Sequence, residues 1–182
     1  MTSIEAYLKY LDDLACKTGE YSLITAADEM PPVWIIKYKN LIEPCSLTTF
    51  TYGLSSVDHK EWTYGRPELI LHVKSENIDW PITLGNVVRL FRGTCAFSYG
   101  EIIRFERRLT YDTEMSAFFV FAPSVVEQKD AAIMLPDRSI NLVQLYPIYE
   151  DEIPLITNLG PTKVFMNPDT DFSDVKRRML NT

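Results

Sequence analysis

Apolar residues recur at helical spacing near the start of the chain: Ile4, Tyr7, Leu8, Leu11 and Leu14. This spacing places them on one face of an amphipathic α-helix. The sequence Thr2-Ser3-Ile4-Glu5 matches a capping box, in which the N-cap hydroxyl and the carboxylate three positions later bind free amides of the first turn. Gly19 offers a stop, so we predict a helix over about residues 3–18.

Six later segments are short, apolar and rich in β-branched or aromatic residues, a composition typical of β-strands. The predicted strands cover residues 33–38, 46–52, 69–73, 101–105, 117–121 and 139–146. We expect the last strand to end at Pro147, because proline has no N–H to donate to a ladder. The stretch from Gly53 to Gly65 is polar and predicts a loop.

Further helices are predicted from their first residues. Asp79 is a plausible N-cap and Pro81 suits a first turn. The acidic run 150–152 suits the positive end of a helix dipole, and Gly160 would end that helix. Asp171 is expected to cap a last helix.

Helices and strands are interspersed without regular βαβ alternation, which favours an α+β fold with a mixed, mostly antiparallel sheet packed with helices. At 182 residues the chain is long enough for one domain with a substantial core. We therefore expect residues 1–182 to form a single domain, with the N-terminal helix packed on it.

The charge of the chain is −7 and is unevenly spread. Residues 66–111 carry 7 Lys and Arg against 5 Asp and Glu, whereas both flanking regions are acidic. An acidic surface repels phosphate backbones, so nucleic-acid binding is not expected. The same surface suits a basic protein partner, although acidity also serves solubility alone.

Cysteine usage and hydropathy bear on location. Cys16, Cys45 and Cys95 are odd in number and unpatterned, which fits buried, reduced thiols in a cytoplasmic protein. The N-terminus lacks the basic and apolar regions of a signal peptide. No apolar run approaches the roughly 20 residues of a membrane helix, so we expect no membrane association.

Motifs for catalysis are weak. The tripeptide His59-Lys60-Glu61 lacks the P-C-x-x-C that follows it in zinc deaminases. His59 and His72 are far apart in sequence and do not form a recognisable metal site. No phosphate-binding glycine loop is present. We expect no catalytic residue, cofactor or metal, while an enzyme that uses a histidine with a cysteine or carboxylate stays open as an alternative.

Two segments combine aromatic and acidic residues as binding surfaces do. The first is the 53–65 loop, with Asp58, Glu61, Trp62 and Tyr64. The second is the junction after the last strand, with Tyr149, Glu150 and Glu152. Each has a structural alternative: Trp62 can pin its loop to the core, and the acidic residues can cap a helix.

Five short segments appear in the order seen in one family: 51–55 (TYGLS), 67–71 (PELIL), 79–81 (DWP), 99–100 (YG) and 143–152 (VQLYPIYEDE). Together they resemble the suppressor-of-fused (SUFU) family from about Val33 to the end of the chain. Ile148 departs from the usual leucine.

This resemblance implies a protein-binding role. Animal members grip a transcription-factor peptide, partly as an added β-strand, and carry an extra C-terminal domain, whereas we expect a single domain here. Stand-alone bacterial members of similar length are regarded as immunity proteins of polymorphic toxin systems. The resulting hypothesis is a non-enzymatic immunity protein that occludes a cognate, basic toxin. The alternatives are a general β-augmentation module and, less favoured, a hydrolase-type enzyme.

Overall fold

One mixed β-sheet organises the part of the chain that the structure describes, residues 1–25, 30–63 and 65–180 of a computed structural model. Its strands are β1 (Glu20–Ile24), β2 (Val33–Lys39), β3 (Leu47–Tyr52), β4 (Arg66–Val73), β5 (Ile102–Arg104), β6 (Ala117–Phe121), β7 (Ala132–Met134) and β8 (Ser139–Ile148). They follow the order β1-β2-β3-β4-β8-β6-β5, and β7 also pairs with β8. Only β4 and β8 are parallel among these paired strands, which confirms the predicted α+β class with a mostly antiparallel sheet.

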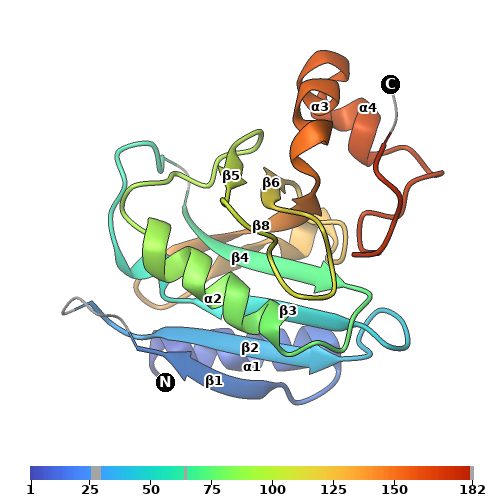
Figure 1. The fold of residues 1–182 in the computed structure, drawn as a ribbon. Helices are drawn as coiled ribbons and strands as arrows, with labels where there is room; N and C mark the ends of the chain where they lie inside the picture. The colour runs from blue at the N-terminus through green and yellow to red at the C-terminus, as the bar shows by residue number, and fades with distance from the viewer. Residues whose placement is uncertain (26–29, 64, 181–182) are drawn as a thin grey trace.

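Helices cover both faces of the sheet (Figure 1). Helix α1 (Ser3–Ala15) lies behind β2 and β3 in this view, and α2 (Asp79–Phe91) lies in front of the sheet. Helices α3 (Ile153–Leu159) and α4 (Pro161–Phe165) lie at one end with the C-terminal segment. Short 3-10 turns are η1 (Leu54–Ser56), η2 (Gln128–Asp130) and η3 (Glu150–Glu152). No helix in the described ranges has the length and apolar character needed to cross a membrane.

Strand β4 shows how the two layers are built. Leu69 and Leu71 pack with Trp80 of α2 on one face, and Ile70 packs with Tyr7 of α1 on the other. All five side chains are fully buried. A strand that is covered on both faces has a nearly continuous run of apolar residues. This run is the pattern that predicts a strand over residues 69–73.

Helix α1 begins as predicted and ends earlier. The Thr2 hydroxyl accepts a hydrogen bond from the Glu5 amide at 3.3 Å, and the Glu5 carboxylate accepts one from the Thr2 amide at 2.7 Å. The helix ends at Ala15, because Cys16 takes a left-handed conformation with φ of 49°. Gly19 lies beyond the end, where a Cβ would come within 2.9 Å of the Tyr38 ring.

The prediction that Pro147 ends the last strand was wrong. Strand β8 continues to Ile148, and Pro147 lies opposite Phe118 of β6. On the side of β8 that faces β4, pairing stops at Gln144. Pro147 lies beyond that point, so its missing N–H does not remove a hydrogen bond to β4.

Other boundaries also differ from the sequence prediction. The N-cap of α2 is Ile78, and Asp79 is already in the first turn. The C-terminal segment around Asp171 forms turns instead of a helix: the Asp171 carboxylate accepts the Ser173 amide and pairs with Lys74. Strands β1 and β7 and helix α4 were not predicted. β1 is almost entirely exposed, so it lacks the apolar alternation that reveals a half-buried strand.

Candidate functional site

The 53–65 loop begins at a buried carboxylate. Glu68 of β4 is 0% exposed and accepts hydrogen bonds from the Thr51 hydroxyl (2.7 Å), the Gly53 amide (2.7 Å), and the Ser55 amide (2.9 Å) and hydroxyl (2.7 Å). Burial raises the pKa of Glu68, and these donors oppose the rise. The TYGLS and PELIL segments therefore meet at Glu68, and their polar residues serve the scaffold.

Gly53 has a conformational reason to be glycine. Its φ is 141°, and an added Cβ would lie 3.2 Å from the carbonyl oxygen of Pro32. Both constraints disfavour any other residue at the point where the chain leaves β3. The start of the loop is therefore fixed by backbone geometry as well as by Glu68.

Farther along the loop, Trp62 and Glu61 behave differently. The Trp62 ring is half-buried against the core beneath α2, and its Nε1 donates to the Ala96 carbonyl at 2.8 Å. The indole thus holds the loop to the 96–100 segment, as the structural alternative supposed. Glu61 is exposed, and its carboxylate makes no hydrogen bond or ion pair within the described ranges.

The remaining predicted loop residues are placed as follows. Asp58 is exposed and forms an ion pair with Arg66 at the start of β4. Tyr64 lies outside the described residues. His59 stacks at a tilt on Trp62, with ring centroids 5.6 Å apart.

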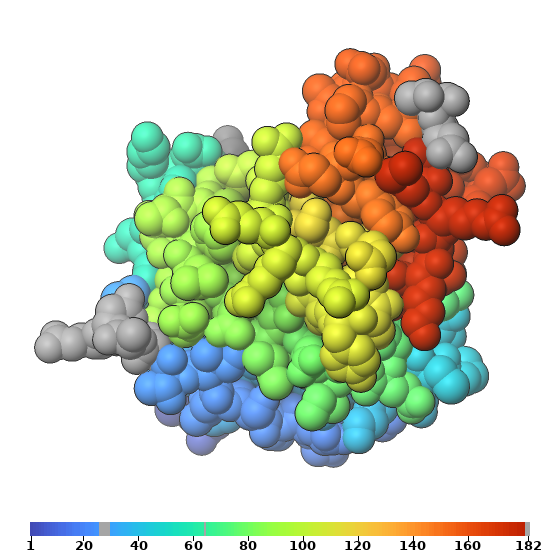
Figure 2. Space-filling model, in the orientation of Figure 1, coloured from blue at the N-terminus to red at the C-terminus, as the bar shows by residue number. Residues whose placement is uncertain are grey.

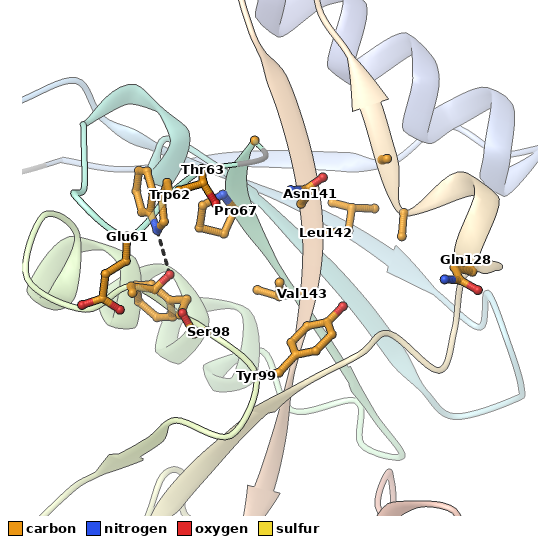
Figure 3. A pocket seen from close by; sticks show the side chains of 15 residues that line it. Glu61, Trp62, Thr63, Pro67, Ser98, Tyr99, Gln128, Asn141, Leu142 and Val143 are labelled. Atoms are coloured by element: carbon orange, nitrogen blue, oxygen red, sulfur yellow. Dashed lines mark hydrogen bonds between the residues drawn. The ribbon is translucent and has the colours of Figure 1, made fainter. Parts of the chain in front are cut away.

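A groove of about 540 Å³ opens beside this loop (Figure 3). Its floor is the face of the sheet where β4 and β8 run in parallel, and Pro67 and Val143 contribute side chains there. Glu61 and Trp62 lie on one side of β8, and Gln128 of η2 lies on the other (Figure 3). The groove therefore joins the loop to elements about 65–80 positions away in the sequence.

The groove is lined mainly by apolar and aromatic side chains. Phe97, Val143 and Leu142 supply apolar lining, and the ring of Tyr99 is 56% exposed at its wall. Neither histidine lines it. No group of three or more His, Cys, Asp or Glu side chains that could hold a metal occurs among residues 1–25, 30–63 and 65–180.

The cysteines and His72 have separate environments. Cys16 and Cys45 are exposed, which corrects the expectation of buried thiols, whereas Cys95 is half-buried and burial raises its pKa to about 12. His72 is 4% exposed, with its Nδ1 2.9 Å from the Thr48 hydroxyl. Burial lowers the pKa of His72.

The second predicted surface, at residues 149–152, is mostly internal. Glu152 is 0% exposed, and its Oε2 lies 2.7 Å from Nη2 of Arg177. It also accepts the amides of Leu180 (2.8 Å) and Tyr149 (3.0 Å). The expectation that Glu152 would face a partner is therefore corrected: its carboxylate is enclosed because the C-terminal segment brings a guanidinium to it.

The other two predicted residues of that corner, Tyr149 and Glu150, differ in their surroundings. The Tyr149 hydroxyl donates to the Arg177 carbonyl at 2.7 Å, so it also serves the fold. Glu150 is exposed, pairs with Arg104 at 3.2 Å, and lines an open hollow separate from the groove. The structure does not bring the two predicted surfaces into one site.

Sequence reasoning missed Tyr99, Gln128 and Val143 as groove residues. Tyr99 belongs to a turn that the family motifs mark, but nothing local tells that the turn faces β8. Gln128 reaches the groove through η2, a 3-10 turn that the sequence did not reveal.

The fold and groove together define an α+β domain with a mixed sheet, helices on both faces and a groove over the parallel strand pair. Within that class the chain belongs to the suppressor of fused family: the model for "Suppressor of fused protein (SUFU)" matches residues 29–178. A search of curated proteins gives no match.

Solved structures share this fold. A putative SUFU homologue from Neisseria gonorrhoeae is 16% identical, with 96% of this chain and 94% of that chain covered and a TM-score of 0.73. A chain of the Sufu–Fu complex is 13% identical over 98% of this chain and 91% of that one, with a TM-score of 0.70. Drosophila Suppressor of Fused is 15% identical with a TM-score of 0.70, and 97% of this chain matches only 50% of that protein.

Proposed function

We propose that this chain is a protein-binding domain whose groove receives a segment of a partner protein, and that the partner is a cognate toxin. In this proposal the chain is a cytoplasmic, non-enzymatic immunity protein of a bacterial toxin system. The observation that carries it is the 540 Å³ groove, which has an apolar floor and an unpaired Glu61 carboxylate at its edge.

The groove has the features of a contact site. A partner gains most of its binding free energy from a few apolar or aromatic anchors buried in such hollows. The floor between Phe97 and Val143 would accept that anchor, and Tyr99 would add ring contact. Glu61 would pair with a lysine or arginine beside the anchor, and the net charge of −7 would speed encounter with a basic toxin.

The family also supports protein binding. One structure with this fold comes from the Sufu–Fu complex, in which Sufu is bound to a protein. Burial of Glu152 and the internal hydrogen bond of Tyr149 leave Glu150 as the exposed member of the second predicted surface. We therefore assign the main contact to Glu61 and the groove, with Trp62 as the residue that holds the loop in place and Asp58, already paired with Arg66, as a secondary contact.

A co-purification experiment tests the proposal. The chain would be co-expressed with the product of the adjacent toxin-like gene, and Glu61→Lys and Tyr99→Ala would be compared with wild type. We expect both variants to lose capture about tenfold or more, because one reverses the paired charge and the other removes ring contact. Glu76→Lys, the same charge change at an exposed residue outside the groove, should capture normally.

The outcomes separate the two parts of the proposal. If wild type captures no product of a neighbouring gene and protects no cell from one, the immunity role fails. If wild type captures a toxin and both groove variants do so equally well, the groove is the wrong surface.

A second binding mode is favoured by one observation. Strand β1 ends the sheet and pairs only with β2 in the described ranges, and Tyr21 and Leu23 on it are 41% and 52% exposed. An edge of this kind can accept an added strand. Because N–H groups alternate in direction along a strand, either Tyr21→Pro or Ser22→Pro would remove an outward donor. Loss of capture by one of them, with normal capture by the groove variants, would favour β-augmentation.

A further inference from the structure

A second, smaller cavity lies between α2 and the segment that follows β5. It measures about 230 Å³ and has three arginines in its lining: Arg89 from α2, and Arg107 and Arg108 from the 105–109 segment. None of its lining residues is acidic. In Figure 2 this segment, yellow-green, occupies the face turned to the viewer, next to α2. Three arginines thus border one hollow in a chain of net charge −7.

The charge in this cavity is largely available to a ligand. Arg107 forms no ion pair or hydrogen bond within the described ranges. Arg89 is half-buried and uses only its Nε, which donates to the Asn86 side chain at 3.2 Å. Arg108 pairs with Glu114 at 2.9 Å, but both side chains are more than half exposed, so water weakens that pair.

The acidic residues nearby line a neighbouring hollow. Glu106, Glu114 and Glu150 line an open hollow with Arg104, and Arg107 and Arg108 border that hollow as well as the cavity. None of them lines the cavity beside α2. The cavity beside α2 is therefore free of carboxylates, while Arg107 and Arg108 lie between it and the mixed-charge hollow.

The cavity wall is held in place before any ligand arrives. The Phe105 amide donates to the Ser116 carbonyl and the Leu109 amide to the Met115 carbonyl, each at 2.9 Å. The Phe105 ring packs edge-on against Phe91, with centroids 6.1 Å apart. A site whose backbone is already ordered loses less entropy when it binds.

The other lining residues limit the kind of anion. Val87, Leu90, Phe105 and Leu109 make about half of the wall apolar. A bare phosphate would meet the guanidinium groups but leave this apolar surface in contact with water. An organic carboxylate matches both the arginines and the apolar wall. Guanidinium binds carboxylate through two parallel hydrogen bonds, and the apolar body of the ligand covers the wall.

We propose that this cavity binds an organic carboxylate with a small aromatic or branched apolar body. The ligand is either a free carboxylic acid or the C-terminal carboxylate of a protein whose last residue is apolar. Arg89 and Arg107 hold the carboxylate, and Leu90 and Phe105 contact the body. The site is independent of the groove and adds a ligand to the proposed toxin contact.

A titration followed by ¹H–¹⁵N NMR tests this assignment with sodium benzoate as the probe. Benzamide, which has the same shape without the charge, and inorganic phosphate, which has charge without the body, are the comparison ligands. We expect saturable shifts confined to residues 83–90 and 105–109 with benzoate, and at least tenfold weaker binding of both comparison ligands.

Two variants connect the shifts to the arginines. Arg89→Gln and Arg107→Gln should each weaken benzoate binding several-fold. Arg178→Gln removes the same charge from an exposed residue outside the cavity and should bind benzoate as wild type does. Equal binding of benzoate, benzamide and phosphate, or equal binding by all three variants, would overturn the assignment.

A second arm identifies the source of the carboxylate. A tetrapeptide ending in phenylalanine with a free carboxylate would be compared with its C-terminal amide. Tighter binding of the free acid than of benzoate, with loss in the amide, indicates a protein C-terminus. Binding of benzoate but not of the peptide acid indicates a free small molecule.

Discussion

The 53–65 loop and the 149–152 corner both combine aromatic and acidic residues, but their carboxylates have opposite uses. Each combines aromatic and acidic residues after a strand of the sheet. At the corner, the Glu152 carboxylate is hydrogen-bonded to Arg177 and to two backbone amides. In the loop, Glu61 keeps its carboxylate in solvent beside a groove. Amino-acid composition therefore identifies candidate binding surfaces. Whether a carboxylate is available to a partner depends on whether a cation of the same chain pairs with it.

The largest expected effect is at the corner. Arg177→Met leaves the Glu152 charge buried without its partner and should lower the free energy of unfolding by about 3–5 kcal/mol. Urea denaturation would measure it. Arg178→Met, the matched change at the next and exposed residue, should stay within about 0.5 kcal/mol of wild type.

A double variant sharpens that result. Combining Arg177→Met with Glu152→Gln removes both charges and should recover much of the stability. If Arg177→Met alone costs no more than Arg178→Met, the corner carboxylate is not held by this pair and could still serve a partner.

The buried carboxylate under the loop should have the next largest effect. Glu68→Ala leaves the amides of Gly53 and Ser55 unpaired, and each such donor costs about 1–3 kcal/mol. We expect a loss of about 3 kcal/mol in urea, with faster hydrogen exchange at both amides. Unchanged exchange at Gly53 and Ser55 would mean that the loop is fixed by Trp62 alone.

A smaller effect depends on pH. Since burial lowers the pKa of His72, the unfolded chain takes up a proton near pH 6.5 while the folded protein does not. The unfolded state then binds more protons, so the free energy of unfolding falls as the pH decreases below about 6.5. His72→Gln should flatten this slope between pH 7 and pH 5. Comparing the stabilities of wild type and variant at pH 8, where His72 is neutral in both the folded and the unfolded state, gives the effect of the changed packing alone. An equal slope in the variant would assign acid sensitivity to other groups.

The smallest effect is expected in the loop itself. Glu61→Gln removes a charge that has no internal partner and should change the free energy of unfolding by less than about 0.5 kcal/mol. Glu152→Gln is the matched substitution at the corner and should be clearly destabilising. Similar stabilities for these two variants would remove the contrast between the regions.

Local signals predicted well what depends on neighbours in sequence. The Thr2–Glu5 capping box and the strand Ala117–Phe121 were predicted with their observed bounds. The continuation of β8 through Pro147 could not be predicted, because it depends on β4 ending its pairing at Gln144. Burial of Glu152 depends on Arg177, which lies 25 positions later.

The groove was predictable only in part. Glu61 and Trp62 were selected from composition, but the cavity needs Val143 and Tyr99, which the sheet order brings beside them. The family could be inferred from five ordered segments, and the family match over residues 29–178 confirms it. What the domain binds does not follow from those segments, because Thr51, Gly53, Ser55 and Glu68 are engaged with one another.

The position of β8 has a consequence for synthesis. Three strands, β4, β6 and β7, pair with it, and β8 begins only at Ser139. Strand β4 is complete at Val73. During translation about 65 further residues are therefore synthesised before β8, its second pairing strand, begins. Over that interval the nascent chain exposes an unpaired strand that other chains could join. Folding of this domain on the ribosome should thus be completed only after β8 has been synthesised.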